Sequence, residues 1–254
     1  MQRLRRLLRK KSVRDAERAF VVEGAKVVGE ALDAGAPVQS AFVGPGAPPE
    51  LVERLLDAGA RVHTLEPGVM ERVADTVTPQ PIAAVVGYID VPLEQLRDAS
   101  LVVVCVDVRD PGNAGTVLRS AEAAGADGVI CCEGSVDVYN PKTVRASAGS
   151  LFHVPVIVGG SPAAATDAVG SFGLTRLATV AHGGPDYATV DLTGRVALLL
   201  GNEAHGLPDE VAGAADAQVS IPMAGRTESL NVGMAAAVLC FEAARQRRRA
   251  GNGD

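Results

Sequence analysis

The chain has no tryptophan, and aromatic residues make up only 3% of its 254 residues. A hydrophobic core must therefore be built mainly from valine, alanine and leucine. Hydrophobic residues reach 47% and charged residues 21%, which is ordinary for a soluble globular protein. The length suits one large domain or two small ones.

Cysteine is also scarce. No two of the four cysteines form a C-x-x-C pair, and three lie in apolar runs, which favours buried thiols in a reducing cytosol. Their spacings match no zinc site, so no metal is expected. No apolar run approaches the length of a membrane span, and basic residues interrupt the N-terminal leucines, so neither a signal peptide nor a membrane partner is expected. The expected location is the cytoplasm.

Several common catalytic motifs are missing. The chain contains neither G-x-G-x-x-G nor G-x-x-x-x-G-K-[ST], which disfavours a Rossmann dinucleotide site and a P-loop. It also lacks G-x-S-x-G and H-E-x-x-H, the motifs of α/β-hydrolases and zinc proteases.

Positive charge is concentrated at the two ends of the chain, although the net charge is −6. Residues 1–14 carry seven basic residues and no acidic one, and four arginines lie between 245 and 249. Basic ends on an acidic body suit contacts with phosphates. The alternative is that these ends only increase solubility.

A domain boundary is expected near residues 90–100, where a polar segment separates two α/β patterns. The predicted domains are residues 1–95, a small α/β domain with a basic N-terminal tail, and residues 96–254. In the first domain, helices are expected at about 14–34, 48–58 and 67–75, and strands at about 39–43, 61–64 and 82–89.

The second domain contains six apolar runs. Runs of this kind predict strands buried on both faces, which is typical of a mostly parallel sheet with helices on both faces. The strands are expected at Leu101–Val108, Gly128–Cys132, Val154–Val158, Arg176–Ala181, Val196–Leu200 and Gln218–Ile221. Helices are expected at Thr116–Ala124, Pro208–Gly213 and Ser229–Arg249, the last with Ser229 as its N-cap.

Three polar segments each follow one of these strands, namely Asp110–Arg119, Gly201–Gly206 and Ile221–Met234. Ligands of parallel α/β sheets bind at the carboxyl ends of strands, so these segments can converge on one site. Taken alone, Gly201-Asn-Glu-Ala-His-Gly206 also fits a plain turn into a helix that begins at Pro208.

Together the segments resemble the motifs of the SpoU (TrmH-type) RNA ribose 2'-O-methyltransferases. The resemblance covers residues 101–249 and rests on Asp110-Pro-x-Asn113-x-Gly115-x-x-x-Arg119, Tyr139–Gly149, Gly201-Asn-Glu203, Ile221-Pro-Met and Ser229-Leu-Asn-Val. It implies a deep trefoil knot in the second domain and a homodimer, with S-adenosylmethionine bound at the knot near the subunit interface. Residues 1–95, around Phe20–Leu32, resemble more weakly the RNA substrate-binding domain of ribosomal-RNA members.

The resemblance also assigns roles to residues. Gly201, Ile221 and Leu230 would line the cofactor site, where glycine lets the backbone approach and main-chain groups can bond an adenine edge. Core packing is the alternative for Ile221 and Leu230.

Arg119 would engage the ribose 2'-OH, and the RNA and Arg119 would be oriented by Asn113, Glu203, Ser229 and Asn231. Because arginine is a poor base, we expect Arg119 to polarise the hydroxyl or pair with a phosphate. The alternative is an Arg119–Glu203 ion pair that only joins two loops.

The predicted reaction is metal-free, in-line methyl transfer to a ribose 2'-OH, with 23S ribosomal RNA favoured because the N-terminal domain is long. Transfer RNA is the alternative substrate. A catalytically silent RNA-binding or ribosome-assembly protein of the same fold is the alternative function, against which the complete set of polar motif residues argues.

Overall fold

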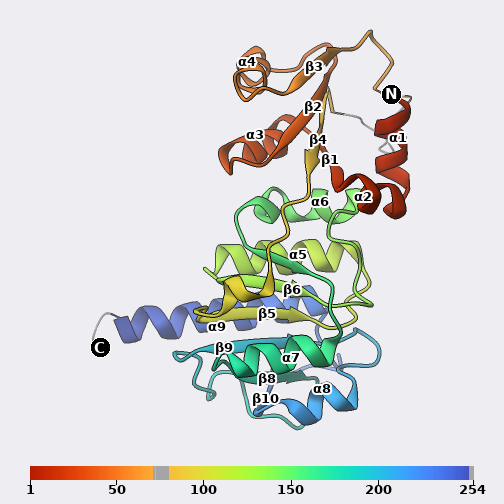
Figure 1. The fold of residues 1–254 in the computed structure, drawn as a ribbon. Helices are drawn as coiled ribbons and strands as arrows, with labels where there is room; N and C mark the ends of the chain where they lie inside the picture. Colours follow the sequence, from red (N-terminus) through yellow and green to blue (C-terminus); the bar gives the residue numbers. More distant parts are fainter. Residues whose placement is uncertain (71, 73–79, 252–254) are drawn as a thin grey trace. The chain divides into compact units, whose positions relative to one another are not determined.

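The computed structural model describes residues 1–70, 72 and 80–251, which form two units (Figure 1). The first unit comprises Met1–Ile89 and Tyr139–His153, and the second comprises Asp90–Val138 and Val154–Asp254. The ring of Tyr139 lies 3.9 Å from that of Tyr88 and 4.7 Å from that of Phe20, measured between centroids. These contacts join the segment 139–153 to the first unit.

The first unit is built on a four-stranded sheet in the order β1-β4-β2-β3. Strand β4 runs antiparallel to β1 and β2, whereas β2 and β3 are parallel. The elements are α1 Gln2–Arg9, α2 Lys11–Glu17, β1 Ala19–Glu23, α3 Ala25–Asp33, β2 Val38–Val43, α4 Pro49–Asp57, β3 Arg61–Thr64, β4 Ile82–Gly87, α6 Pro141–Ser147 and the 3-10 helix η2 Ser150–Phe152.

The helix expected at 14–34 is wrong, because a buried strand interrupts it. Strand β1 pairs with β4, placing Val21 opposite Val85, and Gly24 adopts a φ of +98° between β1 and α3. A residue with a side chain is strained at that φ, so the glycine marks the break. The other expected elements of this unit are confirmed, except the helix at 67–75: residues 67–70 and 72 form turns instead of a helix, and residues 71 and 73–75 lie outside the described residues.

A basic N-terminal tail was expected, but residues 2–9 form helix α1. Its leucines Leu4, Leu7 and Leu8 are buried in a cluster that includes Phe42 and Val85. Spacing by three and four residues places these leucines on one face of the helix and the arginines on the other.

The second unit is a six-stranded parallel sheet in the order β10-β8-β9-β5-β6-β7. All six expected strands are confirmed. The elements are η1 Leu93–Leu96, β5 Leu101–Cys105, α5 Pro111–Ala123, β6 Gly128–Cys131, β7 Val156–Val158, α7 Pro162–Ser171, β8 Thr175–Val180, β9 Val196–Leu200, α8 Asp209–Ala214, β10 Ala217–Ser220 and α9 Val232–Gly251.

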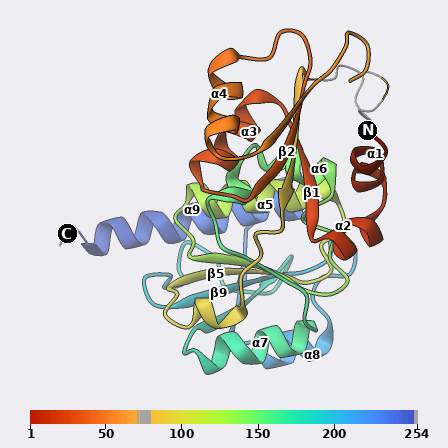
Figure 2. The same ribbon diagram turned by 45° about the horizontal axis from the view of Figure 1, so that its top comes forward.

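Helices cover both faces of this sheet, as expected: α5 and α9 lie on one face, and α7 and α8 on the other (Figures 1 and 2). Every residue of β5 and β9 is buried. Strand β9 follows β8 in sequence and lies between β8 and β5, so the chain returns to the middle of the sheet. Because the strands are parallel, the segments that follow β5, β9 and β10 emerge at one edge.

The cysteines are free and buried, as expected. Burial raises the pKa of the Cys132 and Cys240 thiols to about 12, so both remain protonated at neutral pH. None of the helices in the described part of the chain combines the length and apolar character that a membrane span requires.

Candidate functional site

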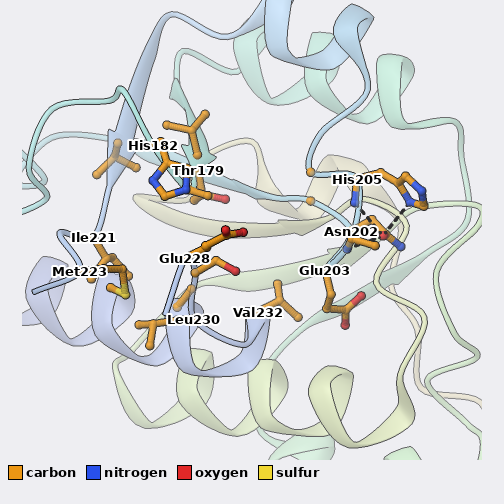
Figure 3. A pocket seen from close by; sticks show the side chains of 18 of the residues that line it. Thr179, His182, Asn202, Glu203, His205, Ile221, Met223, Glu228, Leu230 and Val232 are labelled. Carbon is orange, nitrogen blue, oxygen red and sulfur yellow. Dashed lines mark hydrogen bonds between the residues drawn. The ribbon is translucent and has the colours of Figure 1, made fainter. Parts of the chain in front are cut away.

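A cavity of about 470 Å³ lies at the carboxyl ends of β8, β9 and β10 (Figure 3). Its size is typical of a site for a small molecule or cofactor. The residues Gly201, Ile221 and Leu230, expected to line a cofactor site, all line this cavity. Leu230 is 37% exposed, so core packing does not account for its side chain.

Gly201 is required by its own loop. A Cβ atom there would lie 2.5 Å from the amide nitrogen of Leu207 and closer still to the carbonyl carbon of Gly206. The loop folds back because Asn202 and Gly206 exchange two backbone hydrogen bonds of 2.9 Å. The sequence suggested that glycine allows the backbone to approach a ligand, whereas the close approach observed is between two parts of the loop itself.

Three of the expected polar residues form a hydrogen-bonded chain across the ends of the strands. Asn231 Nδ2 donates to Asn113 Oδ1 at 2.7 Å, and Asn113 Nδ2 donates to Glu203 Oε1 at 2.6 Å. The three residues come from three different polar segments. The convergence of the segments at one edge of the sheet is therefore confirmed.

Helix α9 begins at Val232, three residues after the start of the expected range Ser229–Arg249, and its N-cap is Asn231 rather than Ser229. Asn231 Oδ1 accepts a hydrogen bond from the amide of Gly233 at 2.9 Å, which satisfies a free donor of the first turn. A Cβ at Gly233 would lie 2.9 Å from the Cβ of Thr116, so glycine lets α9 pack closely on α5. Ser229 lies before the helix and lines the cavity.

Helix α5 begins earlier than expected, at Pro111 instead of residue 116. Asp110 is its N-cap, and its side chain accepts a hydrogen bond from the amide of Asn113 at 2.8 Å. Proline at the first helical position adds to this start signal. Asn113 therefore lies in the first turn of the helix, and Arg119 lies further along it.

Arg119 does not line the cavity. Its side chain is exposed, and within the described part of the chain it makes no hydrogen bond or ion pair. The carboxylate of Glu203 is bound by Asn113 instead. The described residues therefore contain no Arg119–Glu203 ion pair of the kind considered as an alternative.

Asn202 is a positioning residue that sequence reasoning did not single out. Its Nδ2 donates to the carbonyl oxygen of Asp107 at 2.9 Å, and its Oδ1 accepts from the amide of Ala204 at 2.9 Å. Asp107 has a φ of +58°, which is unusual for a residue with a side chain. Asn202 thus ties the loop after β9 to the loop after β5. The sequence carries no sign of this positioning role beyond the presence of an asparagine in a loop.

The wall of the cavity is acidic. Glu203 and Glu228 line it together with His182 and His205, and none of the described lining residues is a lysine or an arginine. The described residues contain no group of three or more His, Cys, Asp or Glu arranged to hold a metal ion. The cavity therefore offers carboxylates and apolar surface, which suit an organic cation.

Comparison with known proteins connects this geometry to chemistry. Residues 100–241 match the SpoU rRNA Methylase family, and residues 1–84 match the MRM3-like substrate binding domain. The chain is 34% identical over 234 residues to the 23S rRNA (guanosine(2553)-2'-O)-methyltransferase RlmP of Bacillus subtilis, covering 92% of each protein.

Two similar solved structures contain the cofactor. One is the SpoU methyltransferase AviRb from Streptomyces viridochromogenes in complex with AdoMet, with a TM-score of 0.87, 32% identity and 98% of each chain covered. The other is an AdoMet-bound rRNA methyltransferase from Sinorhizobium meliloti, with a TM-score of 0.84 and 33% identity, covering 96% of this chain and 93% of that one.

Proposed function

Since the chain belongs to the SpoU rRNA methylase family, we infer that it is an S-adenosylmethionine-dependent RNA ribose 2'-O-methyltransferase, and we propose 23S ribosomal RNA as its substrate. The observation that carries this proposal is the cavity of Figure 3, at whose edge the Asn231–Asn113–Glu203 chain joins the three polar segments. A ribosomal substrate implies action in the cytoplasm.

The residues of the cavity fit the cofactor. Gly201, Ile221 and Leu230 supply backbone and apolar surface for an adenosine group, and a carboxylate of the lining, that of Glu228, suits the positive charge of a sulfonium. When bound, the cofactor supplies an electrophilic methyl group. The protein must then hold the ribose hydroxyl in line with that methyl group and help to remove its proton.

Arg119 is the residue assigned to the 2'-OH. A guanidinium stays protonated at neutral pH, so it can donate to the hydroxyl oxygen or to the adjacent phosphate but does not act as a base. Glu203 Oε2 accepts no hydrogen bond from the described residues. In this mechanism, that oxygen and the Ser229 hydroxyl are the groups free to orient RNA.

A homodimer is part of the proposal, because Arg119 lies outside the cavity and a second copy can bring its arginine to this one. The exposed side chains Met234 (59%) and Phe241 (47%) lie seven residues apart on α9, which places them on one stripe. Val232, Ala236 and Leu239 form another stripe of the same helix, but they are buried within one copy. The Met234–Phe241 stripe is therefore the better candidate for the dimer interface. The trefoil knot expected in the second domain is likewise part of the proposal.

Residues 1–95 are proposed to bind the RNA and residues 96–254 to carry the chemistry, a division that the two family matches support. Arg6 and Lys10 are exposed and make no hydrogen bond or ion pair within the described part of the chain, so they are free for phosphates. Deleting the N-terminal residues would not test this contact alone, because it would also remove the buried leucines of α1. The cleaner test is the double variant Arg6→Gln/Lys10→Gln, which should weaken RNA binding and flatten its salt dependence.

The substrate is tested with RNA from a strain that lacks the protein. Purified enzyme and methyl-labelled S-adenosylmethionine are incubated with its ribosomal RNA and transfer RNA separately, and labelled 2'-O-methyl positions are mapped. We expect label at one position of 23S RNA. Label confined to transfer RNA would mean that transfer RNA, and not 23S ribosomal RNA, is the substrate. RNA binding without methyl transfer would instead favour an assembly factor.

A further inference from the structure

The two carboxylates that line the cofactor cavity differ in their surroundings. Glu203 accepts a hydrogen bond from Asn113 Nδ2 at 2.6 Å, and its carboxylate points away from the middle of the cavity (Figure 3). The carboxylate of Glu228 lies in the midst of the lining side chains, on the loop between β10 and α9. Within the described part of the chain, Glu228 makes no hydrogen bond or ion pair.

The nearest basic residue in sequence does not neutralise Glu228. Arg226 lies in the same loop, and both residues line a neighbouring hollow, but the described residues contain no ion pair between the two side chains. The carboxylate of Glu228 is therefore an exposed negative charge at the cavity that has no ion-pair partner among the described residues. A cationic ligand is the natural counterpart of such a charge.

The reaction changes the charge of the ligand at its sulfur atom. When the methyl carbon forms its bond to the ribose oxygen, the sulfur keeps the electron pair of the broken carbon–sulfur bond and the hydroxyl proton passes to solvent water. S-adenosylmethionine carries a net charge of +1, from its sulfonium, ammonium and carboxylate, whereas the product S-adenosylhomocysteine is neutral overall. A carboxylate near the sulfur binds S-adenosylmethionine more strongly than S-adenosylhomocysteine.

We propose that Glu228 is a specificity-determining residue that makes the cavity prefer the cationic cofactor over the neutral product. This assignment rests on the proposed function and adds selection between substrate and product to it. Glu228 stabilises a charge that is present before methyl transfer and absent after it. Its role is therefore to favour loading and product release rather than to lower the barrier.

The test is calorimetric titration of the full-length protein and of Glu228→Gln with three ligands: S-adenosylmethionine, S-adenosylhomocysteine and sinefungin. Sinefungin carries an ammonium group in place of the methylsulfonium, so it separates charge from sulfur chemistry. For unit charges a few ångströms apart beside water, we expect affinity for the two cationic ligands to fall about fivefold. Affinity for S-adenosylhomocysteine should change less than about twofold.

The matched control is Glu210→Gln, which removes the same charge from an exposed site on α8 away from the cavity. It should leave all three affinities unchanged, and thermal melting checks that both variants fold. Equal losses for all three ligands would mean that Glu228 binds the amino-acid ammonium, and no loss would mean that it faces solvent. Either result overturns the assignment. If the wild type binds none of the ligands, the proposed function fails instead.

Discussion

Replacing Gly201 with alanine should disturb the loop Gly201–Gly206, which lines the cofactor cavity, more than any comparably small change at the site. The added Cβ would lie 2.5 Å from the amide nitrogen of Leu207. Ordinary van der Waals contact begins at about 3.4 Å, so the two segments must separate by nearly 1 Å. The neighbours are backbone atoms, which cannot rotate away as the end of a flexible side chain can.

The displacement has two measurable consequences. Forcing an extra carbon into packed structure costs about 1–3 kcal/mol, which corresponds to a fall in melting temperature of about 3–10 °C for a chain of this size. The loop that moves also carries Glu203 and lines the cofactor cavity. We therefore expect affinity for S-adenosylhomocysteine to fall about tenfold or more, because the loop backbone and Glu203 both leave their positions at the cavity.

The assay is thermal melting together with calorimetric titration of S-adenosylhomocysteine. The matched control is Gly213→Ala, because a Cβ at Gly213 in helix α8 would meet nothing within 4 Å. Alanine is the better helix former, so this variant should be about 0.5–1 kcal/mol more stable and bind normally. If Gly201→Ala melts and binds like the wild type, the close approach within the loop is not what requires glycine.

Three further predictions test the reaction, the assembly and the electrostatics. Arg119→Ala should slow single-turnover methylation about a hundredfold or more, with melting and S-adenosylhomocysteine affinity unchanged; Arg119→Lys should not rescue it, and a shared loss of stability with Glu203→Ala would instead indicate a structural role. At micromolar protein concentration the wild type should be a dimer in analytical ultracentrifugation, and Phe241→Lys should be a monomer with lower activity. A fully active monomer would refute an active site completed by the second copy. Hydrogen bonding to Arg176 lowers the pKa of Asp216 to about 2, so the stability that this surface pair contributes is present above about pH 4 and lost as pH falls toward 2. The melting temperature of Asp216→Asn should thus lie slightly below that of the wild type at pH 7, and the gap should narrow below pH 4.

The parallel sheet could be predicted because its strands have a strong local signal. Strand β9, Val196–Leu200, is a run of five apolar residues between Arg195 and Gly201, and every one of them is buried. Strand β1 could not be separated from its neighbours in the same way. Residues 19–23 stand beside a helical pattern at 25–33, and the pairing that makes them a strand is with β4, about sixty residues later. Such non-local pairing leaves little trace in a local pattern.

The N-terminal helix was missed for a different reason, because its signal is present in the sequence. Leu4, Leu7 and Leu8 have the spacing of one helical face, and all three are buried. The seven basic residues of this region fit a phosphate-binding tail equally well, and they interrupt the apolar pattern of the helix. A basic segment with regularly spaced leucines is better interpreted first as an amphipathic helix, whose charged face then becomes the candidate surface for RNA.

The sequence also indicated which polar residues belong to the site, but not how they depend on one another. Both ends of the Asn113 amide are engaged, one by Asn231 and the other by Glu203. Asn231 in turn caps helix α9, so Asn113 connects the start of that helix to the loop after β9. A change at Asn113 would therefore act through the positions of Glu203 and α9. We propose that direct contact with RNA falls to groups that have no partner in the described part of the chain, namely Arg119, the Ser229 hydroxyl and the Oε2 atom of Glu203.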